Sequence, residues 1–245
     1  MTTRAWITEC SAELLKALRA PEYMIPTMIF PVAFYTFFGV IMPQGNGASE
    51  YLLATYGVFA VMGPAVFGFG VAVANERDRG WLDLKRASPA HGASYIVAKI
   101  VVTLLVASLA VALVYAVAGF AADVALPRSV WLALFAVHVS SALPFILIGL
   151  TIGFTLGANA AVAVANLVFM GLAILGGLWI PISLYPDVMQ GFARALPSYH
   201  LGEMALSVAG APGDHTFTNH AVIMLVMTLA LAGLTLFAWH RQRNI

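Results

Sequence analysis

The stretch NERDRGWLDLKRASPAHG, residues 75–92, sets a compact run of mixed charge inside a sequence that is otherwise apolar. The chain of 245 residues is 61% hydrophobic and only 9% charged, whereas a soluble domain carries roughly 25% charged residues. So few charges cannot cover a globular surface in water. The composition therefore predicts a protein embedded in a membrane, with residues 75–92 as a loop at the membrane surface.

Six apolar stretches surround this loop, each long enough to cross a bilayer as a helix, which takes about 20 residues. They are apolar on all sides, which is typical of transmembrane helices and not of the alternating strands of a barrel. The expected spans are about 22–42, 51–75, 95–120, 131–156, 160–180 and 219–240. The predicted fold class is an all-α integral membrane protein with six transmembrane helices, in a single domain over residues 1–245.

The lysines and arginines predict how these spans are oriented. An even number of spans puts both termini on one side, and that side holds ten of the 12 basic residues. The other side holds only Arg128 and Arg194. Because cytoplasmic segments carry the excess of lysine and arginine, we expect both termini and the loop in the cytoplasm. The protein is then a multi-pass protein of a plasma membrane, the bacterial inner membrane.

Residues 1–21 predict an amphipathic helix that lies along the inner membrane surface. Apolar side chains recur there at helical spacing and the charged ones fall largely on other faces, until Pro21 interrupts the pattern. Two interpretations stay open for this interfacial helix. It can be a plain anchor for the first span and it can be a lever that passes motion from a cytoplasmic partner to the membrane, and the two roles are compatible.

The charged loop, residues 76–92, also carries apolar side chains that a fully solvated loop does not need. Trp81, Leu82 and Leu84 lie among charges of both signs. Exposed aromatic and aliphatic residues ringed by charge favour a docking surface. The alternative is that Trp81 sits at the level of the lipid headgroups, as tryptophan often does.

These features resemble the ABC-2 type permease, the transmembrane subunit of an ABC transporter in a six-span exporter family. That family has an amphipathic helix before the first span and a cytoplasmic coupling helix between the second and third spans. The resemblance covers nearly the whole chain. In the loop and the third span it is carried by Glu76, Arg77, Gly80, Trp81, Leu82, Leu84, Pro89, Tyr95 and Lys99. Between the fifth and sixth spans it is carried by Gly176, Gly177, Pro181, Pro186, Pro197 and Tyr199.

The resemblance implies that a separate ABC ATPase, in two copies, docks on the charged loop. It also implies a second permease subunit, identical or different, and ATP with Mg bound by the ATPase. No cofactor is expected in this chain, which has no GxxxxGK[ST] motif for a nucleotide. The residues expected to couple to the ATPase are Glu76, Arg77, Asp78, Arg79, Gly80, Trp81, Leu82, Leu84, Lys85 and Pro89.

The family also implies a translocation path lined by the first, second and fifth spans. Aromatic and apolar side chains in these spans favour export of an apolar or amphipathic substrate, either drug-like or lipid-like. The candidate path residues are Phe30, Phe34, Phe37, Phe38, Phe59, Met62, Phe67, Asn166, Phe169 and Met170.

The segment 181–218 is too long for a simple connector, and long loops tend to be functional. Prolines divide it into short pieces, which predicts a re-entrant helical hairpin on the extracytoplasmic side that caps a cavity. A gate is expected there, formed by Gly176, Gly177, Pro181, Pro186, Pro197 and Tyr199.

Two further features leave alternatives open. Gly149, Gly153 and Gly157 repeat at the spacing that lets helices pack closely, either inside one subunit or between subunits. His138 is an ionisable group in the middle of a span, a functional candidate by default. It permits a rival hypothesis, an intramembrane enzyme acting on lipid or peptide, although no nucleophile motif or acidic partner is evident and no metal site is expected. A third possibility is a membrane anchor that does not transport.

Overall fold

The computed structural model describes the chain except residues 1–2, 43–46, 83, 85–91, 212–215 and 244–245. The described part is helical and contains no strand, which confirms the all-α prediction. The helices are α1 (Thr3–Leu18), α2 (Pro21–Thr36), α3 (Ala48–Asp78), α5 (Gly92–Phe120), α6 (Arg128–Ser140), α7 (Ala142–Thr155), α8 (Ala158–Leu175), α9 (Asp187–Ala193), α10 (Pro197–Ala209) and α11 (Phe217–Arg243). Two short turns complete them, the π-helical η1 (Phe37–Ile41) and the 3-10 turn η2 (Ile182–Leu184).

Six segments of the described chain are long and apolar enough to cross a membrane, as the sequence predicted. They are Pro21–Ile41, Ala48–Asp78, Tyr95–Phe120, Arg128–Thr155, Ala158–Leu175 and Phe217–Arg241. The fourth span consists of two helices, because the chain departs from regular α-helix at Ser141 between α6 and α7. Hydropathy alone shows that span as one continuous run.

The predicted fifth span is too long at its C-terminal end, since α8 stops at Leu175 and not at about residue 180. Gly177 takes a φ of 75°, a left-handed conformation that ends a helix and suits glycine. The side chains of two later residues bind the last carbonyls of α8. Ser198 donates to the Leu172 carbonyl at 2.7 Å and Tyr185 donates to the Ile174 carbonyl at 2.6 Å.

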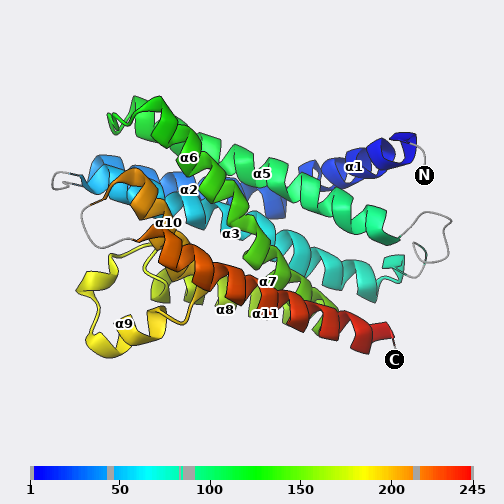
Figure 1. The fold of residues 1–245 in the computed structure, drawn as a ribbon. Helices are drawn as coiled ribbons and strands as arrows, with labels where there is room; N and C mark the ends of the chain where they lie inside the picture. Colours follow the sequence, from blue (N-terminus) through cyan, green and yellow to red (C-terminus); the bar gives the residue numbers. More distant parts are fainter. Residues whose placement is uncertain (1–2, 43–46, 83, 85–91, 212–215, 244–245) are drawn as a thin grey trace.

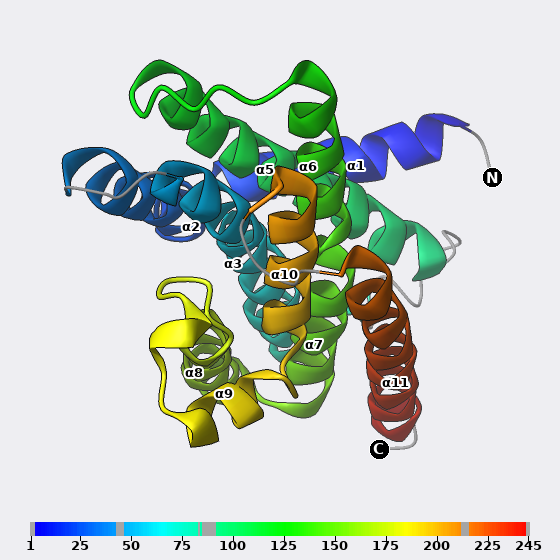
Figure 2. The ribbon, with the colours of Figure 1, turned by 60° about the vertical axis from the view of Figure 1, so that its left-hand side comes forward.

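Helix α3 is the centre of the bundle, with α2, α5, α7, α8 and α10 packed around it (Figures 1 and 2). Its glycines and those of α7 allow close approach. A side chain at Gly149 would lie 2.9 Å from the Ala65 carbonyl oxygen, and one at Gly153 would lie 2.9 Å from that of Phe69. The glycine repeat thus packs α7 on α3 inside one subunit, whereas Gly157 precedes α8.

Both chain termini lie at the same end of the bundle, called here the terminal end (Figure 1). The end of α3 and the junction between α7 and α8 are at this end too. The opposite end, called the far end, carries η2, α9 and α10; this segment, for which the sequence predicted a hairpin, is called the hairpin below. Helix α10 is built into the bundle against α3, α6 and α11, while α9 lies at the margin (Figure 2).

Candidate functional site

The main cavity, with a volume of about 690 Å³, lies among α1, α2, α3, α5 and α8. We call it the α2–α3 cavity. Most of its wall is apolar and aromatic, and its part near α1 is charged. Of the ten candidate path residues, those that line it are Phe30, Phe34, Phe59, Phe67, Asn166, Phe169 and Met170.

Three candidate path residues do not line the cavity. Phe37 and Phe38 belong to η1, beyond the end of α2, where their rings pack edge to face at 5.0 Å. Met62 is fully enclosed by neighbouring helices. The sequence predicted all three as path residues, because in a helix that is apolar on all sides the pattern does not distinguish the face that lines a cavity from the other faces.

An aromatic cluster closes one part of the cavity. Phe34 stacks on Trp179 with ring centroids 4.7 Å apart, and Phe59 contacts the same indole at 5.4 Å. Phe169 joins from α8, 5.2 Å from Phe59 and 5.4 Å from Phe67. The indole Nε1 of Trp179 is buried and has no acceptor in the part of the chain that the structure describes. Sequence reasoning missed Trp179, although a tryptophan directly after Gly176 and Gly177 was a usable signal.

An ion network forms the charged part of the cavity wall. Lys99 of α5 binds Glu13 of α1 at 3.0 Å and Glu76 of α3 at 3.3 Å. Lys16 binds the same two carboxylates at 2.6 and 3.2 Å, and the hydroxyl of Tyr95 donates to Glu76. The network joins α1 to both sides of the charged loop, because Glu76 is the first residue of the loop and Lys99 follows the loop in α5.

Burial and charge act in opposite directions on the α1 members of this network. Burial raises the pKa of Glu13, but Lys99 and Lys16 outweigh it and hold that pKa below its usual value. Burial lowers the pKa of Lys16, and its bonds with Glu13 and Glu76 outweigh that and raise it. Both side chains therefore stay charged at neutral pH, and the buried carboxylate of Glu13 has the charged partners that it requires.

Arg77 and Asp78 are bound to their own chain. The guanidinium of Arg77 donates to the carbonyls of Gly153 and Leu156 at 2.9 and 2.6 Å. The carboxylate of Asp78 accepts the backbone N–H of Ala158 at 2.7 Å. Arg77 thus satisfies carbonyls at the end of α7 and Asp78 an amide at the start of α8, groups that a helix leaves without intrahelical partners. The sequence indicated neither contact.

The exposed part of the charged loop begins directly after α3. Gly80 has a φ of 73° and turns the chain. Trp81 is 49% and Leu84 69% exposed, whereas Leu82 is only 7% exposed and packs into the core. Leu82 is therefore not available to a partner in this structure, contrary to the sequence interpretation. Lys85 and Pro89 lie outside the described residues.

The expected gate residues all lie around the hairpin of the far end. Gly176 touches Ser198 so closely that a side chain would lie 2.1 Å from its hydroxyl oxygen. Pro181 precedes η2, Pro186 precedes α9, and Pro197 is the first residue of α10. Tyr199 and Gly177 complete the set, Tyr199 with its ring 5.7 Å from that of His220 on α11. The hairpin is thereby tied to both α8 and α11.

His138 is fully buried and both of its ring nitrogens are occupied. Nε2 donates to the Ala54 carbonyl at 2.9 Å, and Nδ1 pairs with the Tyr115 hydroxyl at 2.9 Å. Neither partner is an acid, and no group of three metal-ligating side chains occurs among the described residues. These contacts favour a packing role and not catalysis.

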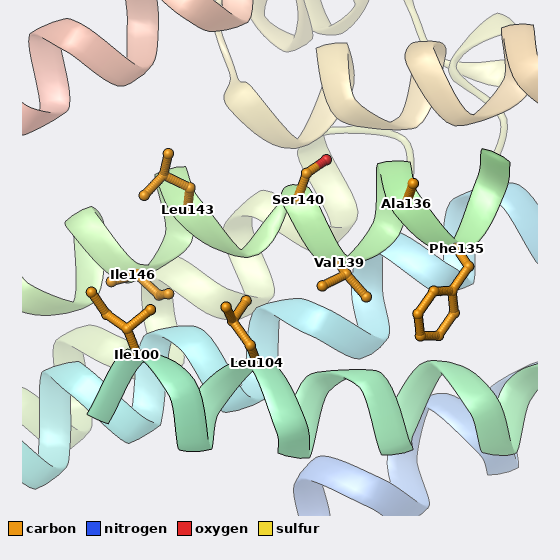
Figure 3. A pocket seen from close by; sticks show the side chains of 8 residues that line it. All are labelled: Ile100, Leu104, Phe135, Ala136, Val139, Ser140, Leu143 and Ile146. Atoms are coloured by element: carbon orange, nitrogen blue, oxygen red, sulfur yellow. The ribbon is translucent and has the colours of Figure 1, made fainter. Parts of the chain in front are cut away.

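A second cavity of about 430 Å³ lies between α5 and the pair α6 and α7 (Figure 3). Ile100 and Leu104 of α5 point toward Phe135, Val139 and Ile146 in Figure 3. Apart from Ser140, whose hydroxyl donates to the Val137 carbonyl, its lining is apolar. It lacks the charged part that distinguishes the α2–α3 cavity.

The similarity to known proteins extends over the residues of the α2–α3 cavity and over the charged loop. A model of the family described as ABC-2 type transporter matches residues 4–209. A similar protein of Bacillus subtilis (strain 168), named "Putative transport permease YvfS", is 29% identical over 222 residues, which make up 89% of this chain and 90% of that protein. The family match ends with α10, before α11.

Proposed function

The chain belongs to the ABC-2 type transporter family, and from this premise we propose that it is the permease subunit of an ATP-driven exporter of apolar or amphipathic molecules. It is a multi-pass membrane protein, and permeases of its family generally work with an ABC ATPase. In the proposed complex two ATPases bind ATP and Mg and act on two permeases. The charged loop and both termini face the cytoplasm of a bacterium, and the permease lies in the inner membrane.

The α2–α3 cavity is the observation that supports a transport role over a plain membrane anchor. It reaches from charged side chains near α1 to the aromatic cluster around Trp179, and an anchor needs no such space. Its volume is within the range of about 300–1,000 Å³ that is usual for small-molecule sites.

The proposed coupling runs through the last turn of α3. Trp81 and Leu84 contact the ATPase, and ATP-driven movement of the ATPase displaces the loop. Glu76 is bound to Lys16 and Lys99, so α1 and α5 follow the displacement. Arg77 and Asp78 transmit it to the junction of α7 and α8 through the hydrogen bonds described above. One local movement thereby acts on helices that line the cavity, and the gate around Gly176 and Gly177 opens in response.

Co-purification tests the docking surface. The tagged chain is purified in mild detergent from its native cells, as wild type and as the double variant Trp81→Ala/Leu84→Ala. An ATPase should accompany the wild type and fall at least about tenfold in the variant, because exposed aromatic anchors dominate such interfaces. Leu82 is left unchanged because its loss would damage the core.

The matched control is Phe120→Ala, which removes an apolar side chain that is 90% exposed at the far end of α5. It should keep the ATPase at the wild-type level. If stable wild-type protein brings down no ATPase, or the double variant retains it in full, the proposed docking is wrong.

A further inference from the structure

The charges along the α2–α3 cavity do not balance, and the imbalance indicates what the cavity accepts. Glu13 and Glu76 are matched by Lys16 and Lys99, each of which contacts both carboxylates. This square of two anions and two cations is neutral. The fifth acidic or basic side chain in the cavity wall is Glu22.

Glu22 makes no ion pair with any residue that the structure describes, and its side chain is exposed. Arg19 lies on the preceding turn but does not line the cavity. The cavity wall therefore carries one surplus negative charge, at the N-terminal end of α2. Asn75 also lines the cavity; its amide nitrogen donates to the Val71 carbonyl at 2.9 Å, and its amide oxygen accepts no hydrogen bond from the described residues.

The rest of the wall is aromatic. Phe30 lies eight residues after Glu22, which is about 12 Å along the helix at 1.5 Å per residue. Phe34, Phe59 and Trp179 follow beyond it. The Nε1 of Trp179 is itself buried, so this part of the wall offers a ligand ring surfaces.

We propose that the α2–α3 cavity binds a cationic amphiphile with an aromatic body, its positive group near Glu22 and its rings among Phe30, Phe34 and Trp179. Aromatic rings and a carboxylate both attract a cation, whereas an anion of the same shape has only the ring contacts and is repelled by the carboxylate. The inference rests on the proposed function in treating the cavity as the substrate's site, and it names the substrate class.

The test compares two ions of matched shape and opposite charge, tetraphenylphosphonium and tetraphenylborate. The purified full chain, without any ATPase, is placed in phosphatidylcholine nanodiscs, and binding of each radiolabelled ion is measured by equilibrium dialysis. Binding to empty nanodiscs is subtracted. Wild-type protein should bind tetraphenylphosphonium saturably.

Glu22→Gln should weaken tetraphenylphosphonium binding about three- to tenfold, because it removes a full charge close to the bound cation. The same variant should leave tetraphenylborate binding unchanged or improve it. Because each ion is compared between the variant and the wild type, the opposite changes in binding of the two ions do not depend on how strongly either ion partitions into the lipid. Phe30→Leu should weaken binding of both ions about three- to tenfold through lost ring contacts.

Glu50→Gln and Phe135→Leu are the matched controls, since they make the same chemical changes outside this cavity. Both should bind like wild type. The proposal is overturned if no saturable binding exceeds that of empty nanodiscs, or if Glu22→Gln affects the two ions alike.

The two proposals can fail separately. If the protein co-purifies with an ATPase but does not bind the cation, the proposed exporter function stands and the proposed substrate class is wrong. If the protein binds the cation but co-purifies with no ATPase, the proposed binding site stands and the proposed coupling to an ATPase is wrong.

Discussion

Gly57 has no side chain, and the His138 imidazole occupies the place where one would be. A Cβ atom on Gly57 would lie 2.1 Å from Cε1 of His138, far inside contact distance. His138 cannot simply turn away, because Ala54 and Tyr115 hold its two nitrogens. The position therefore requires glycine for space and not for backbone flexibility.

The substitution Gly57→Ala should be strongly destabilising, by about 3 kcal/mol, because overpacking a filled core displaces neighbours and here also breaks buried hydrogen bonds. Gly119→Ala is its control, since nothing lies within 4 Å of a Cβ there and alanine favours a helix. Melting temperatures in detergent measure both. An unchanged melting temperature for Gly57→Ala would contradict the packing described here.

Glu13 gives the protein a stability that depends on pH in a defined direction. Its pKa in the folded protein is below the usual 4.5, so its contribution is complete above about pH 4.5 and is lost as the pH falls through the lower folded value. Lys16 acts in the opposite sense. Its raised pKa gives a contribution that is complete below about 10.5 and is lost as the pH rises through the folded value.

Glu13→Gln should therefore be less stable than wild type at about pH 7, by roughly 1–3 kcal/mol, and the difference should shrink as the pH is lowered below 4.5. Thermal unfolding over a range of pH checks this. A difference that stays constant down to the acid limit would show that the ion network does not titrate as described.

At the scale of elements, the C-terminal end of α3 is bound to four other helices. Its last turn binds α1 and α5 through Glu76, α7 through Arg77 and α8 through Asp78. A helix end leaves four carbonyls without partners, and Arg77 supplies donors to two carbonyls at the end of α7. The junction between α7 and α8 is thus short because another helix completes it.

Arg77→Ala should loosen that junction and cost about 1–3 kcal/mol, the range for hydrogen bonds to a charged group. Amide hydrogen exchange at residues 155–160 should become faster than in wild type. Arg79→Ala is the control, because Arg79 is exposed and makes no contact of this kind with the described residues. Equal exchange in both variants would mean that the Arg77 hydrogen bonds do not hold the junction.

At the scale of the whole molecule, the spans could be predicted because a long run that is apolar on all sides crosses a bilayer as an α-helix. The break at Ser141 and the end of α8 at Leu175 could not, since they depend on local backbone conformation and on side chains from later elements. The ion network was also out of reach, because Glu13 and Lys99 are 86 positions apart in the sequence and periodicity cannot pair them.

The candidate site was predictable to a similar depth. The sequence identified residues in spans that line the α2–α3 cavity but not which face of each span does so, and it therefore included Met62, which is buried in the core. Trp81 and Leu82 are adjacent apolar residues that follow the turn at Gly80. The sequence does not indicate that the side chain of Trp81 is exposed while that of Leu82 is buried. Apolar sequence shows which residues avoid water, and the fold decides whether lipid, protein or a cavity replaces it.

Helix α11 is the least buried of the six spans and packs mainly on α7 and α10. Its hydrogen bonds to the bundle include those of Thr235 with Thr151 at 2.9 Å and of His220 with His200 at 2.8 Å. Every surface that it needs is made by residues synthesised before it. The first five spans can therefore assemble before α11 is synthesised, and α11 is the last of the six spans to join the bundle during biosynthesis.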